Sequence, residues 1–459
     1  MKKLMDLFRA TDGKNYVVTF ILVSSLFLLW GVCNGMIDVM DKHFQTELGL
    51  NKSQSAWVQF AHYLGYFLMA LPAGMLATKL GYKGGIIAGL LMVAVGGFWF
   101  IPATHINAAA HAGHASAITA FVGYLVGVCA IAAGLTFLET VANPYTTVLG
   151  PKQFAATRIN LAQSCNGIGW IFGPIIGGMF FYSKDAAGRS TGNETLYIPY
   201  VIVAVVVVVL AVVFYFAYIP DIKTEDEYHL EDSTPSASHS IWSHPHFVLA
   251  VAAQFFYVAA QAGIFSFFIN YMTSEVPAIP PAVTTDLLKS WFETSKDGIL
   301  SLSDKGAANL ASVGFFCFLV GRFTGAALLK KFSAHKVLGL YGVVNVVTCL
   351  LIFLKLGWLS VICVFLSYFF MSIMFPTIFA LGIHGLGARA KKASSFIVMA
   401  IMGGAILPKL MGFVADKYDM SRGFIVPMFC FAFVAFYGYN WPKFSHAESL
   451  HDVKTSGGH

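Results

Sequence analysis

Charged residues are scarce in this sequence. Of its 459 residues only 11% are charged, whereas 57% are hydrophobic. An ordinary soluble domain carries about 25% charged residues, so the composition excludes a water-soluble globular protein. A membrane-spanning helix needs about 20 apolar residues, and the chain is long enough for about twelve such helices. The net charge of +6 is modest and gives no reason to expect a nucleic-acid partner.

Motifs that would fix cysteine chemistry or membrane targeting are also missing. The seven cysteines lie in apolar stretches and none forms a CxxC pair, so we expect apolar packing rather than disulfides or a metal site. The apolar run that begins at Val17 carries Asp38 and lacks a small-residue cleavage site. It therefore predicts a first span rather than a removed signal peptide.

Long apolar runs recur along the chain without a polar–apolar alternation of period two, which favours helices over the strands of a membrane barrel. The runs are bounded by charged or turn residues. They predict spans at 17–40, 56–78, 84–103, 117–143, 155–182, 197–219, 247–273, 306–329, 337–355, 358–384, 394–415 and 422–441.

Two polar segments divide this all-α membrane chain. The segment 221–245 predicts a cytoplasmic central loop between a six-helix half at 1–220 and a second at 246–459. A second insert, 274–305, follows the seventh predicted span, and we expect an amphipathic helix around Leu287–Phe292 within it.

Lys and Arg predict the orientation, because they are enriched in cytoplasmic loops. With the N-terminus inside, the inner connections hold 17 of the 29 Lys and Arg residues and the outer connections hold 10. The short loops 79–83 and 330–336 are dense in them, while 103–117 has none. We expect both termini in the cytoplasm.

The two halves carry similar basic loops at the same position. Gly74 precedes Lys79 and Lys83 after the second span, and Gly325 precedes Lys330 and Lys336 after the eighth. Two six-helix halves related as parallel repeats are typical of a transporter fold with a midplane substrate site.

Two acids lie inside predicted spans, where a charge costs about 2.5–3.5 kcal/mol on insertion scales. Asp38 shares a helix face with Asn34, four residues earlier, and Asp41 follows at the interface, where we expect it to be solvated. Glu139 lies deep in the fourth span with Asn143 one turn later and no nearby Lys or Arg. Function as proton-binding groups is one interpretation of both acids; interface solvation of Asp38 and a structural hydrogen bond of Glu139 are the alternatives.

Polar side chains form a stripe on each of two otherwise apolar spans. Amides carry donors and acceptors without charge, which suits a neutral polyhydroxylated ligand; polar contacts between helices are the alternative. The stripes comprise Asn160, Gln163 and Asn166 on the fifth span and Gln254, Tyr257 and Gln261 on the seventh. Arg322, in the eighth span, fits a structural partner for an acidic group or a helix end.

Several ordered blocks of sequence carry a resemblance that covers the chain from the first to the eleventh span. The sequence resembles the fucose–proton symporter family of the major facilitator superfamily. The blocks are 132–144, 160–163, 321–325, 370–373, 376–379 and 394–399.

The resemblance implies proton-coupled monosaccharide uptake by alternating access across a bacterial inner membrane. It implies that Asp38 and Glu139 are the functional carboxylates, and that Gln163 and Asn166 contact the sugar. Gln261 occupies a corresponding polar position in the seventh span.

The chain departs from the fucose carriers before Pro376. Met374 and Phe375 stand where those carriers resemble Gln-Tyr, and relatives that take glucose, galactose, mannose or N-acetylglucosamine look similar to the Met-Phe form. Some glucose-type relatives use sodium. At the superfamily's usual acidic position between the second and third spans this chain has Thr78.

We therefore expect a monomeric secondary symporter and not an enzyme, with a monosaccharide as substrate, H⁺ as coupling ion and no metal or other cofactor. A sodium-coupled or facilitative carrier is the first alternative, and a membrane enzyme or sugar receptor is a remote one. The expected substrate-binding residues are Asn34, Asn143, Asn160, Gln163, Asn166, Gln254, Tyr257, Gln261 and Phe375.

Overall fold

Helices account for most of the residues that the computed structural model describes. These are residues 8, 15–114, 116–150, 155–186, 190–219, 241–278, 291–294, 300–329, 332–384, 386 and 390–445. The predicted central loop 221–245 lies outside them except for its last five residues, 241–245.

Eleven helical segments within the described residues are long and apolar enough to cross a membrane. Each coincides with a predicted span. The remaining predicted span, 56–78, forms the first part of a longer helix, Trp57–His111, which contains Gly81 at φ 67° and ψ −178°. Gly81 separates two of the predicted spans. Glycine can adopt this positive φ at no steric cost, because it has no Cβ.

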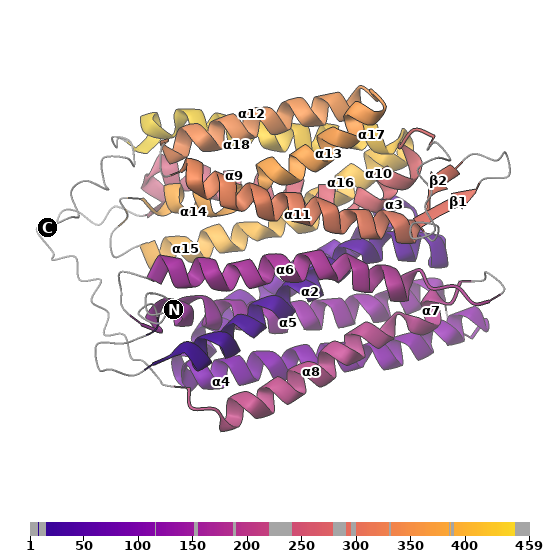
Figure 1. Cartoon of the computed structure of the whole chain (residues 1–459), viewed down its shortest axis with the longest axis horizontal. Coiled ribbons are helices and arrows are strands. Elements are labelled where there is room, and N and C mark those ends of the chain that lie inside the picture. The colour runs from indigo at the N-terminus through magenta and orange to yellow at the C-terminus, as the bar shows by residue number, and fades with distance from the viewer. Residues whose placement is uncertain are drawn as a thin grey trace, which may run out of the picture. The chain divides into compact units, whose positions relative to one another are not determined.

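The first of two compact units comprises residues 1–50, 57–224 and 304–312. Figure 1 shows α4 and α8 running side by side within it. Its helices are α2 (Val17–Leu48), α4 (Trp57–His111), α5 (Ala117–Val148), α6 (Ala155–Phe181), α7 (Gly192–Thr195), α8 (Tyr197–Phe216) and the start of α11 (Asp304–Leu328).

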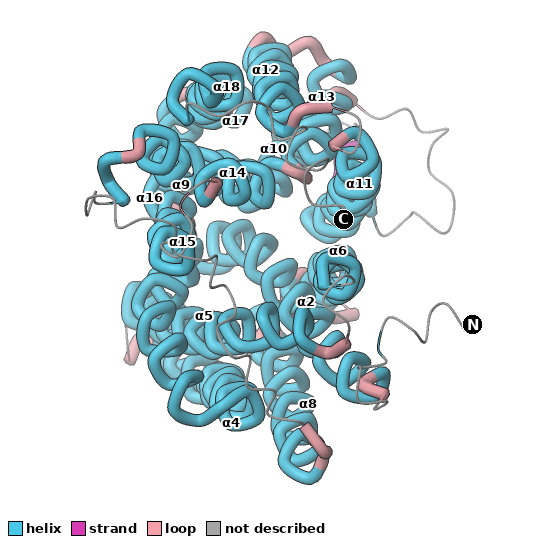
Figure 2. Tube along the Cα trace, turned by 90° about the vertical axis from the view of Figure 1, so that its left-hand side faces the viewer, coloured by secondary structure: helices cyan, strands magenta, loops and turns pink. Residues whose placement is uncertain are grey.

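Glycines bring α2 and α6 into backbone contact. A Cβ at Gly173 would lie 2.5 Å from the Cα of Gly35, and a Cβ at Gly31 would overlap the carbonyl oxygen of Asn166. Small residues permit such an approach between membrane helices. Figure 2, which looks along the helices, shows α2 beside α6.

The second unit comprises residues 51–56, 225–303 and 313–459. Its helices are α3 (Lys52–Ser55), η3 (Ile241–Ser243), α9 (Pro245–Ser266), α10 (Phe268–Ser274), α11 (Asp304–Leu328) from residue 313, α12 (Ala334–Phe353), α13 (Trp358–Met371), α14 (Met374–Ile383), α15 (Ala390–Met399), η7 (Ala400–Met402), α16 (Gly403–Lys417), α17 (Met420–Gly423) and α18 (Ile425–Ser445).

The units differ from the predicted halves in two short segments. Residues 51–56 pack within the second unit because the Asp416 carboxylate accepts the backbone N–H groups of Lys52 and Ser53 at 2.9 and 2.8 Å. The first turns of α11 pack within the first unit, where Lys42 Nζ lies 3.8 Å from Asp304.

The insert 274–305 contains a short antiparallel hairpin of β1 (Phe292–Thr294) and β2 (Leu300–Leu302). The expected helix around 287–292 is therefore wrong at Phe292, which pairs with Leu302 in the hairpin. Residues 287–290 lie outside the described residues.

Three predicted spans are interrupted in the second unit. The segment 247–273 breaks between α9 and α10, 358–384 breaks between α13 and α14, and 394–415 passes through the 3₁₀ turn η7. Pro376 explains the second break, because it lacks the N–H that would bond to the carbonyl of Ser372, four residues earlier.

Candidate functional site

Asp38 lies buried on α2 with a neutral partner. Its side chain is 6% exposed, and its Oδ1 accepts a hydrogen bond from Nε2 of Gln59 on α4 at 3.2 Å. Oδ2 is also buried and has no hydrogen-bond partner within the described part of the chain. One oxygen of the carboxyl group is thus held in place, and the other is buried without a hydrogen-bond partner in the described structure and can take a proton.

Glu139 lies on α5, partly buried. No Lys, Arg or His among the described residues pairs with it. The hydroxyl of Tyr66 on α4 accepts hydrogen bonds from the Trp30 indole, at 2.6 Å, and from the Asn34 side chain. Tyr66 therefore joins α4 to the α2 face that carries Asp38.

The α6 stripe is only partly described. Asn166 is 6% exposed, and its Nδ2 donates to the backbone carbonyl of Phe27 on α2 at 3.3 Å, a contact between helices. Gln163 is partly buried. Asn160 and Asn143 lie on α6 and α5, and their side chains are outside the described ones.

Asp41 differs from the expectation that it is solvated. It is 0% exposed, next to His43, which is also 0% exposed and has Nδ1 2.8 Å from the carbonyl of Phe181. The α2 helix continues to Leu48, beyond the predicted end at residue 40. The predicted span of 24 residues would end just before Asp41 and leave it at the interface. The observed helix has 32 residues and continues past Asp41, which is therefore buried.

In the second unit, the break before Pro376 creates two acceptor sites on the backbone. The carbonyl of Met371 accepts the hydroxyl of Tyr257 at 3.0 Å, and the carbonyl of Ser372 accepts Nε of Arg322 at 3.5 Å. The guanidinium of Arg322 also lies 5.1 Å from the centre of the Phe318 ring. Tyr257 and Arg322 therefore satisfy carbonyls that a continuous helix without proline would have satisfied internally.

Phe375 follows this break directly and is partly buried, with its ring centre 6.4 Å from that of Tyr257. Gln254 lies on α9 one turn before Tyr257 and is fully buried; neither polar atom of its side chain has a hydrogen-bond partner among the described residues. Gln261 is partly buried on the same helix. The α9 stripe and Phe375 thus belong to one region of the second unit.

Sequence reasoning did not single out Gln59, Tyr66 or Trp30. They lie on spans of ordinary composition, and a lone amide or aromatic residue in an apolar run is not unusual. Their spacing was the available signal: Trp30, Asn34 and Asp38 recur every four residues, and Gln59 and Tyr66 are seven apart. Both spacings put side chains on one helix face.

Charged side chains outside the spans form a small network in the second unit. Lys355 Nζ lies 3.0 Å from Asp419 and 3.3 Å from Glu275. Burial of the Asp419 carboxyl group raises its pKa, but the Arg422 backbone N–H and the Lys355 ammonium outweigh this effect and hold the pKa of Asp419 below its usual value. The pKa of Lys355 is raised for the complementary reason: the two carboxylates outweigh its own desolvation.

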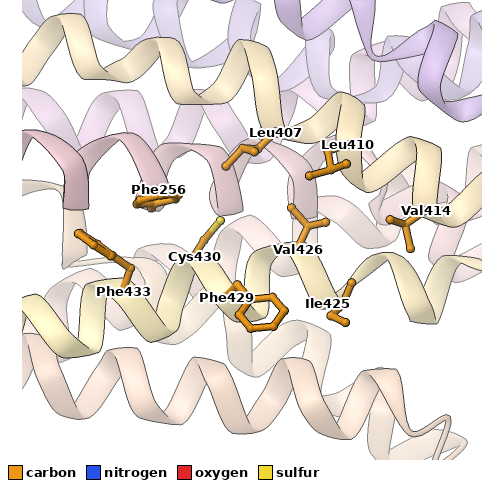
Figure 3. A pocket seen from close by; sticks show the side chains of 9 residues that line it. All are labelled: Phe256, Leu407, Leu410, Val414, Ile425, Val426, Phe429, Cys430 and Phe433. Atoms are coloured by element: carbon orange, nitrogen blue, oxygen red, sulfur yellow. The ribbon is translucent and has the colours of Figure 1, made fainter.

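A groove of about 420 Å³ lies between α16 and α18, with α9 behind it (Figure 3). Its lining side chains are all apolar, apart from the thiol of Cys430. Phe429, at its edge, is 66% exposed. The groove offers no hydroxyl or amide to a polar solute and does not contain any of the predicted site residues. It is lined by Phe256, Leu407, Leu410, Val414, Ile425, Val426, Phe429, Cys430 and Phe433.

Comparison with known proteins decides the family. The family model described as Major Facilitator Superfamily matches residues 16–276. The chain belongs to the major facilitator superfamily. It is 34% identical over 443 residues to the L-fucose-proton symporter of Escherichia coli K12, with 93% of each chain covered. It is 32% identical over 431 residues to a glucose/galactose transporter of Brucella abortus, covering 93% of this chain and 95% of the relative.

Solved structures agree with this assignment. The Escherichia coli fucose:proton symporter, in an outward conformation, superimposes with a TM-score of 0.63 at 33% identity, over 93% of this chain and 99% of that one. A D-xylose-proton symporter superimposes with a TM-score of 0.67 at 12% identity, which shows the fold alone. The predicted fold class and the resemblance to the fucose–proton symporter family are confirmed, and the protein is a multi-pass membrane transporter rather than an enzyme.

Proposed function

We propose that this transporter takes up a monosaccharide together with protons by alternating access. The observation that carries the proposal is the pair of acids in the first unit, Asp38 and Glu139, neither of which has a cationic partner among the described residues. An unpaired acid inside a membrane marks a proton or substrate path by default. The symporter and sugar-transporter names of the relatives point the same way.

Glu139 is the proposed proton-binding group that is filled and emptied in each cycle, and Asp38 shares the proton. Glu139 suits this role because it is only partly buried and is held by no ion pair in the described structure. One proton that moves with a membrane potential supplies about 2.3 kcal/mol per 100 mV, which corresponds to roughly 50-fold accumulation of a neutral solute.

The proposed sugar-contacting residues are neutral hydrogen-bonding and aromatic groups. In the first unit they are Asn34 and Gln163, with Asn166 beside them; in the second, Gln261 and Phe375. A sugar presents hydroxyls that both donate and accept, and amides match both roles. Asn143, Asn160, Gln254 and Tyr257 complete the proposed set. Phe375 stands where the resemblance gives fucose carriers a tyrosine and relatives that take glucose or galactose a phenylalanine, which supports a hexose of the glucose or galactose kind over fucose.

The proposed setting is the inner membrane of a bacterium, with a monomer as the working form and both termini in the cytoplasm. The distribution of Lys and Arg supports this orientation. No cofactor is required by the proposal beyond the coupling cation.

A transport assay in proteoliposomes tests the proposal. Labelled fucose, glucose, galactose, mannose and N-acetylglucosamine would be offered separately under an inward proton gradient, with and without a protonophore. We expect uphill uptake of at least one of these sugars that the protonophore abolishes and that sodium does not alter.

Two outcomes of the same assay would contradict the proposal. Uptake that requires a sodium gradient and survives the protonophore would identify a sodium-coupled carrier. Uptake that only equilibrates, with or without either gradient, would identify a facilitative carrier. Glu293→Gln, which changes a carboxylate in the β1 strand, serves as a control that leaves uptake unchanged.

A further inference from the structure

Two helix faces in the first unit form a polar ladder. On α2, Trp30, Asn34 and Asp38 are four residues apart and lie on one face. On α4, Gln59 and Tyr66 are seven residues apart, about two turns, and lie on one face. The α2 side chains bond to the α4 side chains in antiparallel order: Trp30 and Asn34 reach Tyr66, and Asp38 reaches Gln59.

Asp38 lies at one end of the ladder and Tyr66 at the other. At the first end Gln59, which is 1% exposed, donates to Asp38. At the other end the Tyr66 hydroxyl takes two hydrogen bonds from α2. The buried acid of α2 therefore meets a neutral side chain of α4.

An amide is suited to a carboxyl group that changes its protonation state. The Nε2 of Gln59 donates to the ionised form, as it does here, and its Oε1 can accept from the protonated form after the amide turns over. A lysine at this position would hold the ionised form only, and an apolar residue would satisfy neither form. The Gln59 bond also leaves Oδ2 of Asp38 open.

We propose that Gln59 and Tyr66 are positioning residues for proton coupling, Gln59 through its bond to Asp38 and Tyr66 by holding the α2 face that carries Asp38. The proposal rests on the proposed symport function. Neither residue binds the transported proton. Gln59 fixes which oxygen of Asp38 does so, and Tyr66 fixes the α2 face through the hydrogen bond that it accepts from Trp30.

Other titratable groups lie in this part of the first unit, and their titration also contributes to a pH profile of uptake. The His62 ring lies 5.0 Å from the Tyr66 ring, between Gln59 and Tyr66 on α4, and is 5% exposed. The further groups that face or adjoin the ladder are Cys33, Asp41 and His43 of α2, Tyr63 of α4, Glu139 of α5, Tyr182 after α6 and Tyr200 of α8.

The decisive variant is Gln59→Leu, reconstituted as the full chain in proteoliposomes. Proton-driven sugar uptake would be measured between pH 5 and 9, in parallel with sugar counterflow, which needs no net proton movement. Without its donor the ionised form of Asp38 is less favourable. We expect the midpoint of the pH profile to move upward by about one to two pH units, the size expected for one hydrogen bond to a charged group.

Asn107→Leu is the matched control. Asn107 is a buried amide on the same helix, 2% exposed, and it bonds to the hydroxyl of Tyr124 rather than to a carboxyl group. Its loss costs stability but gives no reason for the pH midpoint to move. Gln59→Glu keeps the side-chain volume and adds a second acid beside Asp38, so a folded protein with a two-step pH profile is expected there.

Tyr66→Phe tests the other end of the ladder. The change removes the acceptor of Trp30 and Asn34 without altering the ring. We expect proton-driven uptake to fall about 5- to 10-fold more than counterflow, the effect of one to two lost neutral hydrogen bonds on the coupled step alone.

The possible results separate this inference from the proposed function. If uptake by the unaltered protein ignores the proton gradient, the proposed function fails. If that uptake is proton-driven but Gln59→Leu keeps its pH midpoint within about 0.3 unit, and Tyr66→Phe lowers uptake and counterflow equally, both residues are merely structural and this inference is overturned.

Discussion

The first unit carries the acids Asp38 and Glu139 inside its spans, whereas the six spans predicted between 247 and 441 contain no Asp or Glu and, apart from their end residues, carry Arg322 and Lys409 instead. The partners differ as well. Asp38 meets a neutral side chain of α4, and Arg322 meets a backbone carbonyl freed by the break before Pro376. A charge that must change in each cycle is best left without an ion pair, while a permanent charge can hold a broken helix together.

The largest expected effect comes from Glu139→Gln, which removes one of the two acids. We expect uphill accumulation of sugar to fall from as much as about 50-fold at 100 mV to simple equilibration, while counterflow continues. Accumulation ratios in proteoliposomes under an imposed gradient measure this. If the variant still accumulates sugar against its gradient, the acids of the first unit do not carry the coupling.

Arg322→Met tests whether the charge of the second unit is structural. The variant loses its bond to the carbonyl of Ser372 and its position over the Phe318 ring, and we expect a loss of about 2 kcal/mol of folding stability. Thermal unfolding in detergent measures the loss. Lys417→Met, which changes an exposed cation on α16, is the control. A change in the accumulation ratio of the Arg322 variant, measured below its unfolding temperature, would assign coupling to the second unit too.

The spans and the two acids could be predicted from the sequence because each rests on a local signal. Apolar runs of about 20 residues mark a span, and a lone carboxyl group stands out within one. The positions of the helix breaks at Phe267 and Ser372 were not predictable in the same way, since hydropathy does not change there. Pro376 accounts for the second break through its missing N–H.

The polar partners were the hardest part of the site to predict. Gln59 and Tyr66 matter because of what α2 places opposite them, and the pairing of two helix faces is a tertiary property. The burial of Asp41 was missed for a related reason: α2 extends eight residues beyond the end of the hydropathy signal at residue 40.

Phe375→Tyr changes a side chain of the second unit and leaves the charge of that unit unaltered. The new hydroxyl restores the residue type that the resemblance assigns to fucose carriers at this position. We expect the ratio of fucose to glucose uptake to rise about 3- to 10-fold, the effect of one neutral hydrogen bond, with the pH midpoint of uptake unchanged. Competition between the two labelled sugars measures the ratio, and an unaltered ratio would remove Phe375 from the proposed site.

The smallest expected effect is that of Asp419→Asn in the charge network outside the spans. The Asp419 pKa is lowered in the folded protein, so this carboxylate stabilises the fold above its unfolded pKa of 3.8 and the contribution is lost as the pH falls through the lower folded value. We expect a loss of at most about 1 kcal/mol. It should be constant from pH 5 to 8 and shrink only below about pH 4. A loss that varies between pH 6 and 8 would contradict this assignment.

The most direct test of the account is the movement of protons when sugar is added to proteoliposomes that hold no gradient. For the unaltered protein and for Arg322→Lys we predict that sugar entry draws protons in and raises the external pH, in a fixed ratio to the sugar transported. For Glu139→Gln we predict sugar exchange without any change of pH. A sugar-induced pH change in Glu139→Gln equal to that of the unaltered protein would contradict the central claim, that the acids of the first unit couple transport to protons.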